Sequence, residues 1–282
     1  MVTEGEKTDK LLVYSPNAGS VTDQVQKRLH EEFADFRFVE FPPPQDYRPM
    51  LTEKATVVAC GGDGTIASVA KVLAGTQHVY GILAMGTFNN FARALKLPTE
   101  FEAALNVVKT GRSRRCTLGK ANDEEFLEAA AIGVFGSAIK LGEAAKDLHY
   151  GDALANLRAM ASESDFAYDI TGDVHLEGRA TSIIVANTPS IGALIPVGET
   201  TPHEHTLELI VTHGRSRLGF FARLLAAILR RRQPAAFESY KIDQIRIETT
   251  PPVSVHADTA DLGKTPVDIS TLPGGLHIIL PA

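Results

Sequence analysis

The chain has 282 residues, of which 44% are hydrophobic and 22% are charged, and its formal net charge is −6. This composition is typical of a globular protein with an ordinary core, and the acidic balance argues against nucleic acid as the main partner. Two cysteines, Cys60 and Cys116, are too few for a disulfide framework. No apolar run approaches the roughly 18 residues of a spanning helix, and the first ten residues are too charged for a signal peptide. We therefore expect a cytoplasmic protein.

The first third of the chain alternates predicted strands and helices. Short apolar runs predict strands at residues 11–14, 36–41, 57–60 and 80–83. Helical spacing of apolar residues predicts helices at residues 22–33, 65–73 and 101–110, the last one ended by Gly111. Strands that alternate with helices in this way favour a parallel sheet with right-handed crossovers.

A glycine-rich turn follows the third predicted strand. It reads Gly61-Gly62-Asp63-Gly64-Thr65, and Thr65 is predicted to cap the helix that follows. Strand, glycine turn and helix N-terminus is the geometry that presents backbone N–H groups to a phosphate. Glycine lets the backbone approach oxygen atoms closely and adopt positive φ angles. The aspartate within the turn indicates a function beyond turning the chain.

A second polar segment follows the fourth predicted strand, Gly86-Thr87-Phe88-Asn89-Asn90-Phe91-Ala92-Arg93. In an open parallel sheet, ligands bind at the carboxyl ends of the strands. The two segments are therefore interpreted as two walls of one nucleotide site. Arg93 is equally compatible with a phosphate contact and with an exposed helix charge.

The two segments at this spacing resemble the diacylglycerol kinase catalytic-domain family, which includes soluble bacterial diacylglycerol kinases, YegS-like lipid kinases, sphingosine kinases and ceramide kinases. The glycine–aspartate turn alone is shared with NAD kinases and phosphofructokinases, whereas the second segment has the lipid-kinase form. The turn at residues 15–19 is similar to the family's Asn-Pro-x-x-Gly motif, with Ser15 in place of the asparagine.

The resemblance implies a fold of two domains. The first is an N-terminal Rossmann-like α/β domain with a parallel sheet, assigned to residues 1–118, onto which the segment 272–282 packs back. The second, residues 119–271, is a β-sandwich-like lipid-substrate domain, and a cleft lies between the two. The residues themselves favour this division, because short predicted strands dominate after Leu118. They fall at residues 126–132, 166–171, 180–186, 207–212, 236–240, 244–249, 253–256 and 276–280, with helices at 137–150 and 152–160.

Phosphoryl transfer needs positioned phosphates, a divalent cation and a group that accepts the proton of the hydroxyl. Asp63 is the candidate base or Mg²⁺ ligand, and its alternative role is to stabilise a helix dipole. The resemblance adds Asp258 as a second catalytic residue. The candidate nucleotide-binding residues are Ser15, Gly61, Gly62, Gly64, Thr65, Gly86, Thr87, Asn89 and Arg93. ATP and Mg²⁺ are the implied cofactors, and a lipid is the implied substrate.

Two motifs of the family are altered in this chain. The Asp-Gly-Glu motif appears as Asp258-Thr259-Ala260, so the glutamate is missing. Asp261 is adjacent, but on an extended chain its side chain faces away from that of Ala260. The Asp-Gly-x-Leu-Asp motif appears as Glu204-His205-Thr206-Leu207-Glu208. Turnover and a binding role without turnover therefore both remain open.

Four further segments each allow two interpretations. Gly263-Lys264-Thr265 lacks the first glycine of a P-loop, and His203 with His205 is interpreted as part of a polar loop rather than a metal site. Arg112, Arg114 and Arg115 are interpreted as a solvated linker, with a phosphate clamp as the alternative. Residues 218–232 predict an amphipathic helix that ends in three arginines. Such a helix either packs on the sandwich or lies at the inner face of a membrane.

The sequence therefore predicts an ATP- and Mg²⁺-dependent kinase that phosphorylates a lipid hydroxyl, diacylglycerol-like or related. The alternatives are a lipid- or nucleotide-binding protein of the same fold that has lost turnover, and an NAD kinase, which the second segment disfavours. The apolar residues that would select one lipid are not identified by any motif.

Overall fold

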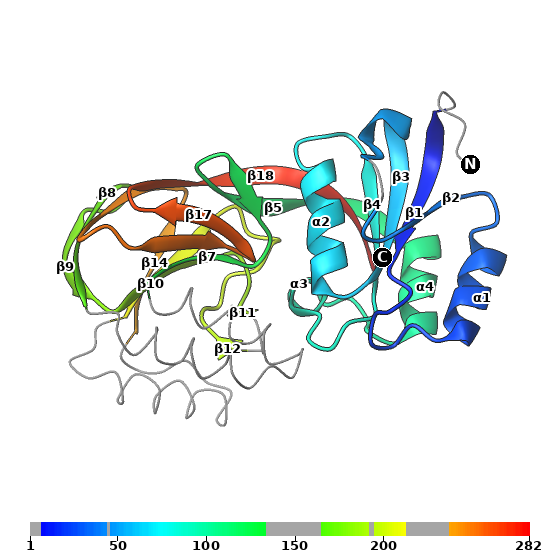
Figure 1. Cartoon of the computed structure of the whole chain (residues 1–282), viewed down its shortest axis with the longest axis horizontal. Helices are drawn as coiled ribbons and strands as arrows, with labels where there is room; N and C mark the ends of the chain where they lie inside the picture. The colour runs from blue at the N-terminus through cyan, green and yellow to red at the C-terminus, as the bar shows by residue number, and fades with distance from the viewer. Residues whose placement is uncertain (1–6, 44–45, 134–164, 192–194, 213–236) are drawn as a thin grey trace. The chain divides into compact units, whose positions relative to one another are not determined.

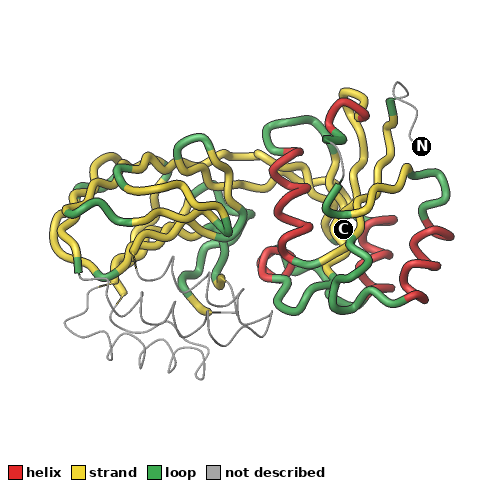
Figure 2. The backbone as a smooth tube through the Cα atoms, viewed as in Figure 1, coloured by secondary structure: helices red, strands yellow, loops and turns green. Residues whose placement is uncertain are grey.

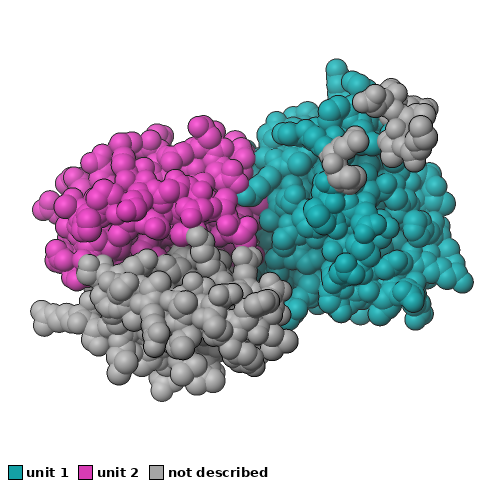
Figure 3. Space-filling model, viewed as in Figure 1, with its two compact units in different colours: residues 1–118, 273–282 teal, residues 119–272 magenta. Residues whose placement is uncertain are grey.

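The computed structural model describes residues 7–43, 46–133, 165–191, 195–212 and 237–282. The chain divides into two compact units (Figure 3). Unit 1 comprises Met1–Leu118 and Pro273–Ala282, and unit 2 comprises Gly119–Leu272. Each unit is described separately below.

Unit 1 is built on a parallel sheet. Its strands are β2 (Arg37–Glu40), β1 (Thr8–Tyr14), β3 (Leu51–Gly61), β4 (Val79–Ala84) and the end of β18 (Val267–Leu280), which pair in that spatial order. Every one of these pairings is parallel. The strand β5 (Arg112–Ala121) pairs with β18 as well. The predicted Rossmann-like parallel sheet is confirmed, although β3 begins six residues before the apolar run that predicted it.

Helices cover both faces of this sheet (Figures 1 and 2). Helices α1 (Asp23–Glu32) and α4 (Phe101–Thr110) lie on one face, where Leu29 and Leu105 join a buried cluster with Leu12, Val58 and Leu83. Helix α2 (Asp63–Leu73) contacts β3 and β4, and the Tyr80 hydroxyl on β4 donates a hydrogen bond to its Ile66 carbonyl. Short helices η1 (Arg48–Met50) and α3 (Asn90–Ala94) complete the unit. Burial of these apolar side chains is the main stabilising contribution to this unit.

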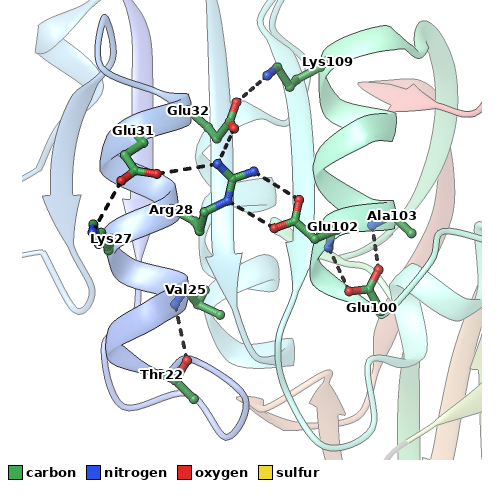
Figure 4. Close-up of polar contacts among 10 residues, drawn as sticks. All are labelled: Thr22, Val25, Lys27, Arg28, Glu31, Glu32, Glu100, Glu102, Ala103 and Lys109. Carbon is green, nitrogen blue, oxygen red and sulfur yellow. Dashed lines mark hydrogen bonds and ion pairs between the residues drawn. The ribbon is translucent and has the colours of Figure 1, made fainter.

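A surface network of charges ties α1 to α4 (Figure 4). Arg28 on α1 pairs with Glu32 one turn along at 2.6 Å and with Glu102 of α4 at 3.2 Å. Lys109 of α4 in turn pairs with Glu32. Because these side chains are partly exposed, water and salt screen their attraction, and the network contributes little compared with the apolar cluster beneath it.

This network leads to a prediction about pH. The hydrogen bond from Lys109 is the largest of the effects that lower the pKa of Glu32 below its usual 4.5. A lowered pKa means that the ionised carboxylate stabilises the folded state above pH 4.5, and that this contribution is lost as the pH falls through the folded-state pKa. We expect Glu32→Gln to lower the melting temperature more at pH 7 than at pH 3. The exposed Glu53 provides the control, because Glu53→Gln should change little at either pH; equal shifts for both variants would contradict the prediction.

Unit 2 contains two antiparallel sheets. In the first, β9 (Leu176–Ala180), β8 (Phe166–Gly172), β15 (Gln244–Thr250) and the beginning of β18 pair in order, and β6 (Glu124–Phe126) pairs with the end of β5. The second has the order β14-β13-β10-β7-β16-β17. Its strands are β7 (Ala129–Gly133), β10 (Ser182–Ala186), β13 (Leu207–Thr212), β14 (Phe237–Ile242), β16 (Ser254–Ala257) and β17 (Ala260–Lys264). A two-stranded ribbon pairs β11 (Ser190–Ile191) with β12 (Ile195–Pro196).

Both sheets of unit 2 contribute to one apolar core. Ile170 and Ile245 from the first sheet and Ile132, Ile183 and Leu209 from the second belong to the same buried cluster. Inward-facing residues of two sheets that share a core define a sandwich. The predicted β-sandwich-like fold of this part of the chain is therefore confirmed.

Several predicted elements differ from the structure. The single strand predicted at 126–132 is two strands, β6 and β7, while β9 and β17 were not predicted at all. Arg112, Arg114 and Arg115 are exposed, as expected of a solvated linker, but the segment is a strand, β5, which runs from unit 1 into unit 2. The helices predicted at 137–150, 152–160 and 218–232 fall outside the described residues. Within the described ranges, no helix has both the length and the apolar character needed to cross a membrane.

Both cysteines are buried free thiols, as the absence of a disulfide framework predicted. Burial raises the pKa of each thiol, to about 12 for Cys60 and for Cys116. The thiolate is the nucleophilic form of cysteine. Neither side chain is therefore suited to covalent chemistry at neutral pH.

Candidate functional site

Three loops meet at the carboxyl ends of β1, β3 and β4 in unit 1. The Ser15 N–H after β1 donates to the Cys60 carbonyl at 2.9 Å, and the Ser20 N–H donates to the Met85 carbonyl at 3.1 Å. The Met85 N–H after β4 donates to the Gly61 carbonyl at 2.8 Å. These bonds bring the two segments singled out in the sequence, and the turn after β1, to one edge of the sheet. This is the edge at which open parallel sheets bind ligands.

The glycine turn leads directly into α2. The helix begins at Asp63 with Gly62 as its N-cap, so the prediction that Thr65 caps it was wrong. The Thr65 side chain is buried against the backbone of Gly61, where a Cβ would come within 2.6 Å of its Oγ1. The first N–H groups of a helix have no intrahelical acceptor and form the positive end of its dipole. The first turn of α2 therefore suits an anion, as predicted for a phosphate.

The glycines of the site allow backbone segments to pack closely together, and they do not adopt unusual backbone angles. Gly62 has φ of −82°, and the described glycines with positive φ all lie elsewhere, so the expectation of positive φ was wrong. A Cβ on Gly86 would lie 2.7 Å from the Gly62 Cα and 2.9 Å from the Asn89 Oδ1. The two turns are thus packed backbone against backbone. Gly64 differs from the others because it is exposed. A Cβ at this position would have no other atom within 4 Å.

Asp63 joins the two segments through its carboxylate. Its Oδ2 accepts a hydrogen bond from the Asn89 N–H at 3.0 Å, and its Oδ1 accepts one from the Asn90 N–H at 2.9 Å. These are the N–H groups at the start of α3, so one carboxylate stands in the first turn of α2 and also caps α3. No pattern in the sequence indicated this bridging role. The alternative role predicted for Asp63, stabilisation of a helix dipole, agrees with this position, and the roles as base or Mg²⁺ ligand stay predictions.

Asn89 shapes the second turn. Its backbone is left-handed, with φ of 53°, a region in which asparagine is among the few non-glycine residues found. Its buried side chain accepts from the Gly86 N–H at 2.9 Å and donates to the Gly86 and Ala84 carbonyls at 3.0 and 3.3 Å. The predicted role was contact with the nucleotide. In the structure these polar contacts hold the turn, and a nucleotide contact of Asn89 stays a prediction.

The remaining predicted binding residues of unit 1 lie nearer the surface. Thr87 and Arg93 are exposed and Ser15 is half-buried. The Arg93 Nε donates to the Phe88 carbonyl at 2.8 Å, which fixes one side of the guanidinium and leaves its other N–H groups for an anion. The structure therefore places Ser15, Gly62, Gly64, Thr87 and Arg93 in the loops and helices that directly follow β1, β3 and β4.

Asp258, the second predicted catalytic residue, belongs to unit 2. Its carboxylate accepts three backbone hydrogen bonds, from Leu127 at 2.8 Å, Glu128 at 2.9 Å and Ala129 at 3.2 Å. Its own N–H donates to the Ala129 carbonyl at 2.9 Å. These contacts anchor the break between β6 and β7. A carboxylate that accepts several backbone N–H groups is strongly held in place.

The altered motif around Asp258 forms a hairpin. Asp258 and Thr259 make the two-residue turn between β16 and β17, and Asp258 has φ of 50°. Ala260 and Asp261 are consecutive residues of β17, so their side chains face opposite sides of the sheet, as predicted. The Asp261 carboxylate lies 3.8 Å from the buried His256 Nε2. Asp261 therefore does not replace the missing glutamate.

The other altered motif surrounds a lysine. Lys241 Nζ lies 2.9 Å from a carboxylate oxygen of Glu204 and 3.9 Å from one of Glu208. Glu208 is buried and also accepts the N–H groups of Glu199 and Thr200, at 2.7 and 3.0 Å. The acidic pair is thus neutralised by a side chain of this chain and by backbone dipoles, which satisfies the buried carboxylate.

The rival motifs have no support in the described residues. His203 and His205 lie in the loop before β13, and in the ranges the structure describes no three His, Cys, Asp or Glu side chains are grouped to hold a metal. Gly263 and Lys264 are part of β17, and Gly263 has φ of +81°. A P-loop would instead lead into a helix.

The comparisons with known proteins assign the class. The sequence profile of the diacylglycerol kinase catalytic domain matches residues 10–121, and that of the YegS C-terminal NAD kinase beta sandwich-like domain matches residues 134–280. Together they cover both units. The chain therefore belongs to the diacylglycerol kinase catalytic-domain family.

Relatives agree with this assignment at low identity. The chain is 28% identical over 238 residues to a Staphylococcus haemolyticus protein named "Putative lipid kinase SH2167", covering 79% of this chain and 75% of that one. It is 25% identical over 248 residues to a diacylglycerol kinase of Staphylococcus aureus, covering 83% and 77%. These relatives agree with the family assignment made by the sequence profiles, and their substrates do not transfer at these identities.

Solved structures support the fold. A diacylglycerol kinase from Bacillus anthracis superposes with a TM-score of 0.72 at 22% identity, covering 96% of this chain and 97% of that one. An NAD kinase from Archaeoglobus fulgidus in complex with ATP gives 0.51 at 15% identity, covering 97% and 93%. At these identities both likenesses concern the fold alone, and the NAD kinase is the more distant.

Proposed function

We propose that this protein is an ATP-dependent lipid kinase that transfers the γ-phosphate of ATP to the hydroxyl of a diacylglycerol-like or related lipid. The observation that carries the proposal is the edge of the unit 1 sheet, where the first turn of α2, Gly64, Thr87 and Arg93 are presented in a chain of the diacylglycerol kinase family. Exposed N–H groups and a guanidinium at such an edge are the groups that bind phosphates.

The residues divide between binding and positioning in this proposal. The N–H groups at the start of α2 and the Arg93 guanidinium bind the phosphates, while Ser15 and Thr87 line the nucleotide. Asp63 holds the two glycine segments at the separation seen here, through its bonds to Asn89 and Asn90. Phosphoryl transfer depends chiefly on such positioning and on neutralised charge.

Mg²⁺ is the second proposed cofactor. Mg²⁺ that accompanies nucleotides is usually held by one or two carboxylates together with water and the phosphates themselves. Asp63 fits this pattern, because it is only half-buried and each of its oxygens accepts a single hydrogen bond in the described contacts. Bound Mg²⁺ supplies charge neutralisation for the transferred phosphoryl group.

The second candidate function is binding without turnover. Its support is specific: Ala260 stands where the family has glutamate, and Asp261 is turned toward His256. Asp258 is also engaged by three backbone N–H groups. In this alternative the protein binds nucleotide or lipid and transfers nothing. NAD phosphorylation is disfavoured, since the second segment has the lipid-kinase form.

Incubation of the purified chain with labelled ATP, Mg²⁺ and a panel of lipid alcohols tests the proposal. We expect weak phosphorylation of at least one lipid and none of NAD. We also expect Ala260→Glu to increase the rate, because a restored carboxylate supplies proton transfer that is typically worth about 10²–10⁴ in rate. Ala260→Gln is the matched control, being similar in size but without the charge. If no lipid is phosphorylated by either protein while both bind ATP, the binding function replaces the kinase.

A further inference from the structure

Three arginines stand together at the start of β5 in unit 1. Arg112, Arg114 and Arg115 are all exposed, and they lie on a strand rather than on a loose segment. The chain is tightly packed where the strand begins. Gly111 lies so close to the Leu280 carbonyl that a Cβ at this position would be 2.4 Å from its oxygen. A Cβ on Gly274 of β18 would lie 3.2 Å from the Arg115 Cδ, so that side chain lies along the neighbouring strand. The three guanidinium groups are therefore presented from a rigid element.

These arginines differ from the others that the structure describes, because no carboxylate or carbonyl among the described residues binds their guanidinium groups. The remaining described arginines all have a partner. Ion pairs hold Arg28, Arg48, Arg179 and Arg246, a hydrogen bond to Phe88 holds Arg93, and Arg37 also has an interaction. Three unpaired guanidinium groups within four residues form a concentrated positive charge, which attracts anions.

The charge of the whole chain does not cancel this patch locally. The net charge is −6, but the excess of Asp and Glu over Lys and Arg lies in residues 119–272, whereas unit 1 is close to balanced. Arg112 and Arg114 share one face of the strand, so their like charges favour a shared anionic ligand. Guanidinium binds phosphate oxygens in pairs, which makes a surface of phosphate groups the matching partner.

We propose that Arg112, Arg114 and Arg115 form a docking surface for a bilayer that contains anionic phospholipids. The inference rests on the proposed function in one respect, since a lipid kinase must meet a substrate that resides in such a bilayer. It differs from the helix predicted at residues 218–232, which lies outside the described residues. The charge of an edge strand also prevents strands from pairing between molecules, and the experiment must separate these two roles.

The experiment measures binding of the full-length chain to vesicles by sedimentation. The vesicles contain phosphatidylcholine alone or with about 30% phosphatidylglycerol, an anionic content that gives the bilayer a strongly negative surface potential. We expect binding only to the anionic vesicles, weakening as salt rises. The triple variant R112Q/R114Q/R115Q should bind on the order of 100-fold more weakly, about five-fold for each arginine. The variant R112K/R114K/R115K keeps the charge and should regain most of the affinity.

Two controls make the result specific. The variant Lys7→Gln, Lys54→Gln, Lys96→Gln removes the same charge from exposed positions elsewhere in unit 1 and should bind like the wild type. Light scattering of each variant reports self-association. If the glutamine variant of β5 aggregates but binds vesicles normally, the arginines protect the strand edge and the proposal is overturned. Equal losses for both glutamine variants, or stronger binding to a nucleic acid than to vesicles, also overturn it.

The proposed function is checked separately on the same proteins. ATP binding and phosphorylation of lipid dispersed in neutral detergent micelles should be the same in the wild type and in R112Q/R114Q/R115Q. Loss of vesicle binding with micelle activity retained supports both proposals. Loss of vesicle binding in a protein that phosphorylates no lipid supports the docking surface and contradicts only the kinase.

Discussion

Replacing Gly64 with alanine is expected to stabilise the free protein and to weaken its binding of ATP. Gly64 is the second residue of α2, and alanine is favoured over glycine in helices by up to about 1 kcal/mol. The new methyl group meets nothing within 4 Å in the free protein, so no clash offsets the gain. A phosphate seated on the first turn of α2 would meet that methyl group. The stability of this variant should therefore rise while its affinity for ATP falls.

The affinity for ATP should fall by about ten-fold, within the about 1–3 kcal/mol that an extra methyl group costs in a packed contact. Thermal unfolding and calorimetric titration with ATP measure the two effects. Gly86→Ala is the comparison, because its methyl group would collide with the Gly62 Cα at 2.7 Å and should lower stability as well as affinity. If Gly64→Ala binds ATP as the wild type does, the first turn of α2 is not the phosphate site.

Asp63→Asn is expected to have the largest effect of any single change in unit 1. The carboxylate accepts the N–H groups of Asn89 and Asn90, one on each oxygen. An amide offers one oxygen and one NH₂ group, so one of the two N–H groups would face another donor. Loss of such a bond with its partner left unsatisfied costs about 1–3 kcal/mol. Loss of this hydrogen bond would also change the separation of the two glycine segments, and lipid phosphorylation should therefore be lost.

Melting temperature, ATP affinity and kcat together identify what Asp63 does. If it only positions the two segments, all three fall together. If it also carries the proton or Mg²⁺, kcat falls further, by about 10²–10⁴, than stability and affinity alone would explain. Phe91→Leu is a useful control, since it perturbs the buried side of α3 without removing a hydrogen-bonding group. Full activity in Asp63→Asn would remove Asp63 from the site.

The sequence was most informative where local signals decide structure. The helix predicted at 101–110 is observed with the same bounds, because Glu100 accepts the N–H groups of Glu102 and Ala103 at its start and Gly111 ends it. The strand predicted at 207–212 is likewise observed unchanged, since each of its residues is buried. Apolar periodicity and caps are properties of neighbouring residues, which the sequence displays directly.

The sequence was least informative where distant residues decide structure. The strand predicted at 126–132 is interrupted because Asp258, more than a hundred residues later, binds the N–H groups of Leu127, Glu128 and Ala129. Asp63 lies 26 and 27 residues before Asn89 and Asn90, and no sequence pattern links them. One signal of the start of α3 was present in the sequence, because Asn89 and Asn90 precede apolar residues, and asparagine is a common N-cap residue. Strand β9 was missed because Glu177, Gly178 and Arg179 have little strand propensity.

The strand β18 makes the formation of unit 1 depend on residues that follow the whole of unit 2 in the chain. Residues 273–282 pair with β4 only after the whole of unit 2 has been translated, although β4 lies within the first hundred residues. On the ribosome, β4 thus has an unpaired edge while most of the protein emerges, and the pairing closes a loop of nearly two hundred residues. Contacts of such sequence separation form late and slowly. The parallel sheet of unit 1 is therefore completed only after unit 2 has been synthesised, and until then the open edge of β4 is a place where another strand can pair.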